Sequence, residues 1–419
     1  MQHFVKEGRT PMLYLDITQT LRSGLNTGIQ RVSRKIAEEA LKAKESSNLN
    51  CKVVFSVDGG KSFLIISNLS ILDSLKQSRL LRIKSFLTKR IREVNSFEWF
   101  GLKDKHSTLF DAFNYQSSNL ILKWQLKKFT FDRVQELRSD DIVLCGDAFW
   151  NSNNDANRLV HVTNSGAKLA IIVHDLFPIS NPLWFEKRSI NLFRRNFERV
   201  VSSAQAIYCV SEFTLNQLEV FFPENRIRAF QTRTSFELGS DFIELTEESW
   251  QKIPNEIIMV GTIEPRKNYQ DILHWFERYG ENFQLTVIGK PGWKSNEIIK
   301  QLNFLNDGHS NFRYIERCSD TELRSLLQQS HIGVCSSFAE GFGLPLREFR
   351  FFGINVVATA IPTFISLQSD SHISYYKTGD IESLNEEILK ASSKPTVRNT
   401  NIYTWSKSFK DLYALAQSK

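Results

Sequence analysis

At 419 residues, with 41% hydrophobic and 24% charged residues, the chain has the composition of a globular protein and is too long for one ordinary domain. Its five cysteines are odd in number and scattered without CxxC spacing, which argues against a disulfide framework or a zinc site and favours buried free thiols. The net charge of +7 leaves anionic partners open.

Targeting signals are not visible in the sequence. The first six residues, MQHFVK, lack the apolar core of a signal peptide. No apolar run approaches the ~20 residues that are needed to span a bilayer. We therefore predict a cytoplasmic protein, with peripheral contact at the inner face of the membrane left open.

The first half of the chain alternates short apolar runs with helical patterns, which predicts a parallel α/β architecture. Five runs are predicted as strands: 12–16, 53–57, 142–146, 168–173 and 206–210. Apolar residues recur at three- and four-residue steps from Ile29 to Ala40, so a helix is expected there with Thr27 as its N-cap. Residues 60–130 fit the alternation poorly and are predicted as helical excursions.

Residues 76–92 form a basic segment without any acidic side chain. Its cations are Lys76, Arg79, Arg82, Lys84, Lys89, Arg90 and Arg92. One interpretation is contact with anionic lipid head groups or with a lipid-diphosphate acceptor. The other is the solvated face of a helix that packs on the core. Aromatic residues are not interleaved as in platforms for single-stranded nucleic acid, so no nucleic-acid partner is expected from this segment.

The second half repeats the α/β alternation. Its predicted strands are 256–261, 284–288, 311–314, 332–336 and 355–359. Ser319 and Glu322 have the spacing of a capping box before a helix. The acidic, proline-containing stretch at 241–255 suggests a domain boundary. A helix is expected from residue 403 to the end. The predicted domains are 1–248, 249–402 and a C-terminal helix at 403–419.

A helix N-terminus is predicted within the segment AEGFGLPLRE, residues 339–348. Pro345 suits the first turn of a helix, and Gly353 suits its end. The backbone amides before this turn would then have no intrahelical partner: Phe342, Gly343 and Leu344. Such amides form a site for an anion such as a diphosphate.

Two carboxylates and two cations complete this candidate site. Glu340 and Glu348 flank the glycines of the segment; Glu348 could accept hydrogen bonds from a ribose diol, and Glu340 from a sugar. Arg266 and Lys267 directly follow the predicted strand 256–261. Ligands of an open α/β sheet collect at the carboxyl ends of its strands, so these cations would face the same cleft.

The Glu-x7-Glu segment resembles the signature of retaining GT-B glycosyltransferases, particularly glycosyltransferase family 4. Five further blocks are similar to that family and follow its order: TGIQRV at 27–32, VHDLFP at 173–178, CVSEFT at 209–214, VGTIEPRKN at 260–268 and VIGKPGW at 287–293. The likeness covers residues 12 to 410, nearly the whole chain.

The resemblance implies two Rossmann-like domains that face each other across a cleft, with the C-terminal helix crossing back to the first domain. It implies transfer of a hexose, with retention, from a nucleotide diphosphate sugar to a saccharide or lipid-linked saccharide acceptor. The sequences at 27–32 and 264–268 are similar to those of mannosyl- and rhamnosyltransferases of surface-polysaccharide assembly, including O-antigen. GDP-mannose is therefore the first donor expected.

Site residues are implied by the same resemblance. His174 and Glu340 would be catalytic, and Gly28 and Asp175 would lie on the acceptor or sugar side. The donor-binding residues would be Arg266, Lys267, Phe342, Gly343, Leu344 and Glu348. Simpler interpretations stay open: a structural histidine at a strand end, solvated cations in a turn, a carboxylate favoured by a helix dipole, and a tight turn at Gly28.

The chain departs from the family pattern at three places. Thr262 stands where many relatives carry an arginine, so the positive charge for binding a donor diphosphate would have to come from Arg266 and Lys267. Bulky residues, FRFF at 349–352, replace the small residues that usually follow Glu348, so that helix must pack differently. The segment 361–366 lacks a carboxylate that is often found there.

No metal and no cofactor are expected, because the sequence has no Asp-x-Asp-like motif beside the predicted cleft. Two other functions remain as alternatives. One is a nucleotide-sugar epimerase on the same architecture. The other is a non-enzymatic, basic protein that binds membranes or nucleic acid through residues 76–92.

Overall fold

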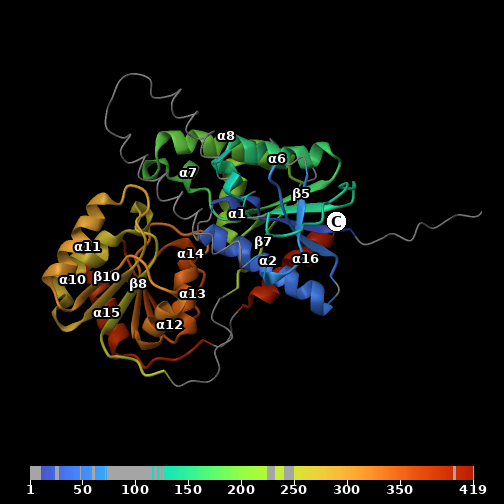
Figure 1. Ribbon diagram of the computed structural model, residues 1–419. Helices are drawn as coiled ribbons and strands as arrows, with labels where there is room; N and C mark the ends of the chain where they lie inside the picture. The colour runs from blue at the N-terminus through green and yellow to red at the C-terminus, as the bar shows by residue number, and fades with distance from the viewer. Residues whose placement is uncertain are drawn as a thin grey trace, which may run out of the picture.

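The computed structural model has two lobes, each built around its own β-sheet (Figure 1). The residues that it describes are 11–23, 28–47, 49–58, 62–70, 72, 116–117, 120–122, 124, 127–223, 232–239, 250–399 and 403–418. The basic segment 76–92, the expected N-cap Thr27 and the expected boundary at 248/249 all lie outside these residues.

The N-terminal lobe contains a seven-stranded sheet in the order β3-β2-β1-β4-β5-β6-β7. Its strands are β1 (Leu13–Asp16), β2 (Cys51–Phe55), β3 (Leu64–Ile66), β4 (Ile142–Cys145), β5 (Lys168–Val173), β6 (Ala206–Cys209) and β7 (Thr232–Ser235). All neighbours are parallel except β2 and β3, which are antiparallel. The central strands are continuous apolar runs because helices cover both faces of the sheet.

Two helices in the described part of the N-terminal lobe begin at a capping serine. The helices described there are α1 (Thr18–Ser23), α2 (Gly28–Ser47), α6 (Asn153–Asn164), α7 (Phe177–Ser180), α8 (Lys187–Ser203) and α9 (Glu212–Phe221). Ser152 caps α6 by accepting a hydrogen bond from the amide of Asp155, and Ser211 caps α9 through the amide of Thr214. α2 buries Val32, as its predicted periodicity requires.

The C-terminal lobe contains a six-stranded parallel sheet in the order β10-β9-β8-β11-β12-β13. Its strands are β8 (Glu256–Val260), β9 (Gln284–Ile288), β10 (Phe312–Ile315), β11 (Ile332–Cys335), β12 (Asn355–Thr359) and β13 (Ile373–Tyr376). Its helices are α10 (Tyr269–Tyr279), α11 (Asn296–Gly308), α12 (Asp320–Gln329), α13 (Leu344–Phe351), α14 (Pro362–Ile365) and α15 (Ile381–Ser393). Half of the predicted capping box is present: Ser319 accepts a hydrogen bond from the amide of Glu322, whereas the Glu322 carboxylate pairs with Arg313.

The last helix, α16 (Trp405–Gln417), returns to the N-terminal lobe and packs against α2 (Figure 1). The hydroxyl of Ser408 donates to the carbonyl of Glu237 at 2.7 Å. Trp405 and Phe409 join the hydrophobic core that also contains α2 and β1. The predicted crossing of the C-terminal helix is thus confirmed.

A buried network of charges lies where β1 ends. Arg158 of α6 is fully buried and forms ion pairs with Asp16 at the end of β1 and with Asp155. Arg22 of α1 binds the same Asp155 at 2.7 Å. Asp16 also accepts a hydrogen bond from the amide of Thr18 at 3.0 Å. The network therefore fastens α1 to the carboxyl end of the sheet.

All ten predicted strands are present, with ends shifted by at most two residues. Three further strands were not predicted: β3, β7 and β13, each at an edge of its sheet. β3 has only three residues and lies within 60–130, where helical excursions were expected, and β7 and β13 contain polar residues, so none of the three shows a long apolar run. α1 was also missed, because its six residues are too few to show periodicity. No helix in the described parts of the chain is long and apolar enough to cross a membrane.

Candidate active site between the two lobes

Arg266 and Lys267 lie next to Glu340, as the candidate site requires. The two cations belong to a 3-10 turn, Pro265–Lys267, that follows β8, and Glu340 lies in the loop that follows β11. Lys267 Nζ is 2.5 Å from Glu340 Oε1, and an Arg266 guanidinium nitrogen is 2.7 Å from Glu340 Oε2. Both strands are central in the C-terminal sheet, so their carboxyl ends place these loops side by side.

Further hydrogen bonds hold the two loops together. Arg266 donates to Glu264 at 2.6 Å and to the carbonyl of Ala339 at 2.8 Å. Ser337 donates to Glu340 at 2.6 Å. Ser336 donates to the carbonyl of Lys267 at 2.9 Å. These bonds fix the carboxylate and the cations of the cluster relative to each other.

The charges of the cluster shift the pKa of each carboxyl differently. Burial by itself would raise the pKa of Glu340, but Arg266 and Lys267 outweigh it and lower the pKa to about 2. Burial raises the pKa of Glu264 and of Asp175 despite the neighbouring Arg266. Glu340 is therefore the carboxylate that neutralises the two cations in this structure.

The helix N-terminus predicted from the glycine-rich segment is also present. α13 begins at Leu344 after Gly343, whose φ of +81° is the left-handed conformation that favours glycine. Pro345 lies in the first turn, and Gly353 follows the helix with φ +71°. The amide groups of residues 342–344 have no hydrogen-bond partner among the described residues. These donors begin two residues after Glu340.

Glu348 of α13 is buried and forms an ion pair with Arg31 of α2, in the other lobe. The neighbouring Arg347 pairs with Glu237 of the N-terminal lobe and stacks on the ring of Phe342, 4.1 Å from its centroid. In Figure 1, α13 faces α2 across the junction of the lobes. The carboxylate predicted to bind a ribose is therefore already in contact with a cation of the N-terminal lobe.

His174 and Asp175 approach the cluster from the N-terminal lobe, at the end of β5. His174 Nε2 is 2.8 Å from the carbonyl oxygen of Gly146, to which it donates, and the ring is buried. This contact fits the structural interpretation of His174, whose catalytic role remains a prediction. Asp175 is close enough to Arg266 and Glu340 for their charges to affect its pKa.

The backbones of the two lobes lie close together at Gly341. A Cβ atom added there would overlap the carbonyl oxygen of His174 and would lie 3.5 Å from the Cβ of Asp175. Ser211 of the N-terminal lobe donates to the carbonyl of Gly341 at 2.5 Å. Glycine at this position therefore permits the backbone contact between the lobes, beside the charged cluster.

A Gly341→Ala variant is expected to lower the activity of the candidate site about 100-fold, because its methyl group would hold the lobes apart beside the charged cluster. Steady-state kinetics measures the rate, and small-angle scattering should show a larger radius of gyration. Gly308→Ala is the matched control, since a Cβ atom at Gly308 meets nothing within 4 Å. An unchanged rate in Gly341→Ala would mean that this contact does not matter.

His174 is expected to make the fold less stable as the pH falls. Burial lowers the pKa of His174 in the folded protein from 6.5 to about 4. Between these two pH values the unfolded chain binds a proton at His174 and the folded chain does not. Stability is thus lost as the pH falls from 6.5 toward 4, by up to about 3 kcal/mol. Urea unfolding of the wild type and of His174→Gln should diverge over this range, whereas His309→Gln, at an exposed site, should follow the wild type.

Other sequence predictions have different outcomes in the structure. Gly28 begins α2, and a Cβ atom there would meet nothing within 4 Å, so neighbouring atoms do not require glycine. The bulky residues after Glu348 point into the core: Phe349 packs where Gly333 leaves room, and Phe352 contacts Trp250 with ring centroids 5.0 Å apart. They do not enter the space around the charged cluster.

Three residues of the cluster were not predicted as site residues. Glu264 and Ser337 hold Arg266 and Glu340, and Arg31 binds Glu348. Glu264 and Arg31 lie inside blocks that resemble the family, so those blocks were the available signal. Within the described ranges, histidine, cysteine and acidic residues nowhere gather in threes as ligands for a metal ion.

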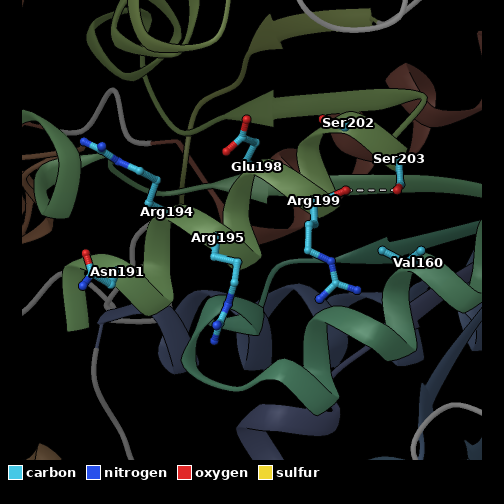
Figure 2. A pocket seen from close by; sticks show the side chains of 8 residues that line it. All are labelled: Val160, Asn191, Arg194, Arg195, Glu198, Arg199, Ser202 and Ser203. Atoms are coloured by element: carbon cyan, nitrogen blue, oxygen red, sulfur yellow. Dashed lines mark hydrogen bonds between the residues drawn. The ribbon is translucent and has the colours of Figure 1, made fainter. Parts of the chain in front are cut away.

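A separate hollow of about 630 Å³ lies between α6 and α8 (Figure 2). Its lining residues are Val160, Asn191, Arg194, Arg195, Glu198, Arg199, Ser202 and Ser203. Asn153 and Asn157 accept hydrogen bonds from Arg195 and Arg199, at 2.9 and 2.7 Å. None of the predicted site residues lines this basic hollow.

Comparison with known proteins identifies the C-terminal lobe. Residues 243–404 match the family described as Glycosyl transferases group 1. The chain carries a glycosyl transferases group 1 domain. This domain contains Arg266, Lys267, Glu340 and Glu348, and the match confirms the resemblance seen in the sequence.

A curated relative from Escherichia coli is the serotype-specific mannosyltransferase WbdA, 29% identical over 273 residues. The match covers 58% of this chain and 33% of WbdA, so the chain spans about a third of that relative's length. The chain is thus similar to part of a larger mannosyltransferase.

Two solved structures share the fold of nearly the whole chain. Sucrose-phosphate synthase from Thermosynechococcus elongatus has a TM-score of 0.57 at 10% identity, and covers 98% of this chain and 94% of its own. HepE from Anabaena, solved with UDP and glucose, has a TM-score of 0.54 at 12% identity, with coverage of 97% and 95%. The predicted GT-B fold is confirmed.

Proposed function

We propose that the protein is a retaining, metal-independent glycosyltransferase that moves a hexose from a nucleotide diphosphate sugar to a saccharide or lipid-linked saccharide. One observation supports this proposal. Arg266 and Lys267 both pair with Glu340, and the amides of residues 342–344, which have no partner among the described residues, follow Glu340 in the same loop. All of these residues belong to the glycosyl transferases group 1 domain. Mannose is the first candidate for the sugar, because the curated relative is a mannosyltransferase.

The reaction breaks the bond between the anomeric carbon and the donor phosphate, and forms a bond from that carbon to an acceptor hydroxyl oxygen. Negative charge grows on the departing diphosphate, and the acceptor hydroxyl passes its proton to the phosphate oxygen that leaves as the new bond forms. Arg266, Lys267 and the amides of Gly343 and Leu344 are fixed donors that can stabilise this charge. A nucleotide that reaches α13 brings its ribose toward Glu348, which Arg31 already holds in place.

Glu340 would have two effects on such a donor. Its carboxylate is bonded to both cations, so the diphosphate must compete with it for Lys267 and Arg266. Once displaced from them, the carboxylate lies beside the transferred sugar and can accept hydrogen bonds from its hydroxyl groups. The same side chain would thus weaken nucleotide binding and support sugar transfer.

A Glu340→Gln variant is therefore expected to bind GDP about tenfold more tightly, a gain of about 1.4 kcal/mol, yet to transfer sugar more slowly. The neutral amide competes less for the cations, but it cannot replace the charged acceptor beside the sugar. Calorimetric titration and steady-state kinetics measure the two effects. Glu297→Gln, on the exposed face of α11, is the control. Weaker GDP binding by Glu340→Gln would contradict the competition.

The proposal is tested by calorimetric titration with GDP, UDP, ADP and dTDP, followed by transfer assays with the matching mannose and glucose donors. We expect binding of GDP, activity that survives EDTA, and a product whose anomeric configuration, seen by NMR, is that of the donor. A folded protein that binds none of the four nucleotides would defeat the proposal. Isomerised donor in a reaction without acceptor would favour an epimerase instead.

A further inference from the structure

A short segment of the N-terminal lobe lies across the C-terminal lobe through two aromatic contacts. The segment consists of residues 182–185 and follows α7. It places the ring of Trp184 over Phe338, with centroids 6.2 Å apart and planes 22° apart. The ring of Phe185 stacks in the same way on Trp293, at 5.3 Å and 24°. Trp293 Nε1 donates to the carbonyl of Trp184 at 2.9 Å, which fixes the segment in place.

Large apolar side chains are left in water at this crossing. Leu183 is 88% exposed and Phe338 is 44% exposed. A single exposed leucine needs no explanation, but Leu183 is the sequence neighbour of Trp184, and Phe338 stacks on the ring of Trp184. We call these three residues, Leu183, Trp184 and Phe338, the aromatic rim. Exposed apolar groups that gather beside a candidate active site are typical of a binding surface.

The aromatic rim is joined directly to the charged cluster. The amide of Phe338 donates to the carbonyl of Arg266 at 2.8 Å, and Phe338 is two residues before Glu340. On the side of the N-terminal lobe, Phe177 packs edge-on against Trp184 with centroids 5.9 Å apart, and the Arg266 guanidinium lies over Phe177 at 5.3 Å. A ligand chain that leaves the cluster toward solvent along these contacts meets the aromatic rim next.

We propose that the aromatic rim is the acceptor subsite, where a pyranose ring of the saccharide acceptor packs its apolar C–H face on Trp184 and Phe338. This inference rests on the proposed function. A pyranose has one face of C–H groups and a belt of hydroxyls, so it can cover the exposed ring of Phe338 and the accessible part of the half-buried Trp184 while its hydroxyls stay in water. Aromatic side chains suit such a ligand because they are rigid, large and apolar, and their negative faces attract C–H groups.

The exposure of the rim also favours a saccharide over an acyl chain. A hydrocarbon chain gains affinity in proportion to the apolar area that it covers, and three side chains offer little of it. A sugar ring is small enough for one or two aromatic rings to cover its C–H face. Because the rim combines residues of both lobes, it is complete only when the lobes are closed, so acceptor binding would favour closure.

Ligand-observed NMR titration of the full chain with a panel of mannose, glucose and galactose disaccharides, in the presence of GDP, tests the proposal. We expect at least one disaccharide to bind the wild type and to bind Leu183→Ser and Trp184→Ala at least tenfold more weakly. Trp184→Phe keeps an aromatic face and should restore most of the affinity. Phe304→Ser is the matched control, because Phe304 is also apolar and 72% exposed but lies on α11.

Thermal melting and GDP titration of each variant separate a local effect from misfolding. Leu183 is so exposed that its replacement cannot disturb the core, so its variant decides the outcome if Trp184→Ala unfolds. GDP binding without any disaccharide binding, or equal disaccharide affinity in Leu183→Ser and the wild type, would overturn the rim and leave the proposed function standing. Variants that lose octyl phosphate instead of disaccharide would also overturn it, in favour of an acyl chain. Loss of GDP binding by the wild type would defeat the proposed function itself.

Discussion

A Lys267→Ala variant is expected to transfer sugar about 100- to 1000-fold more slowly than the wild type. Lys267 is one of two side-chain cations that could meet the charge on a departing diphosphate, and its ammonium group is held 2.5 Å from Glu340 in a buried position. Fixed donors of this kind act in a site with little water, where the loss of one raises the barrier by about 3 to 4 kcal/mol. Steady-state kinetics with saturating donor measures the effect.

The fold should survive this substitution, because Arg266 still pairs with Glu340 at 2.7 Å. The variant should therefore melt cooperatively, which separates lost catalysis from lost structure. Lys300→Ala is the control: it removes a lysine with the same charge from an exposed pair with Glu297 on α11. If Lys267→Ala retained full activity, Lys267 could not be a donor-binding residue.

An Arg158→Met variant is expected to lower the free energy of unfolding by about 3 to 5 kcal/mol. Its fully buried guanidinium is paired with Asp16 and Asp155, and without it both carboxylates would remain in the interior with fewer partners. Burial lowers the pKa of Arg158 to about 9, so the side chain is charged at neutral pH. Urea unfolding monitored by circular dichroism measures the loss.

Two further proteins make this test specific. In a double variant, Arg158→Met with Asp16→Asn, Asp155 keeps its ion pair with Arg22 and no unpaired charge remains in the network, so much of the lost stability should return. Arg313→Ala removes an arginine whose side chain is 57% exposed and whose ion pair with Glu322 is long, at 3.7 Å, and it should change stability by less than about 1 kcal/mol. A loss below 1 kcal/mol in Arg158→Met would show that the network contributes little.

The fold could be predicted wherever local sequence determines structure. β5, with the sequence KLAIIV, is buried along almost its whole length and is visible as an apolar run. β7, with the sequence TRTS, lies at an edge and has no such run, so it could only be found in the structure. The same contrast separates the capping box at Ser319, which four residues define, from the short helix α1, which depends on Arg22 and the buried charges behind it.

The candidate site was predictable to the same extent. Glu340 and the helix that begins at Leu344 are defined by one continuous segment, and the structure places Lys267 beside it. The pairing of Arg31 with Glu348 joins residues 317 positions apart and exists only because the lobes meet, so no local pattern indicates it. The bond from His174 to the carbonyl of Gly146 is likewise a product of packing. The roles proposed for these residues in transfer stay predictions.

The return of α16 to the N-terminal lobe makes the C-terminal lobe an insertion in a continuous first domain. Gly239, before the C-terminal lobe, and Trp405, after it, both belong to the first domain, and they touch, since a Cβ atom on Gly239 would overlap the backbone nitrogen of Trp405. The C-terminal lobe is thus inserted between two neighbouring points of the first domain. A short loop could replace it to give a minimal first domain, and the C-terminal lobe of a related protein could be grafted between the same two positions.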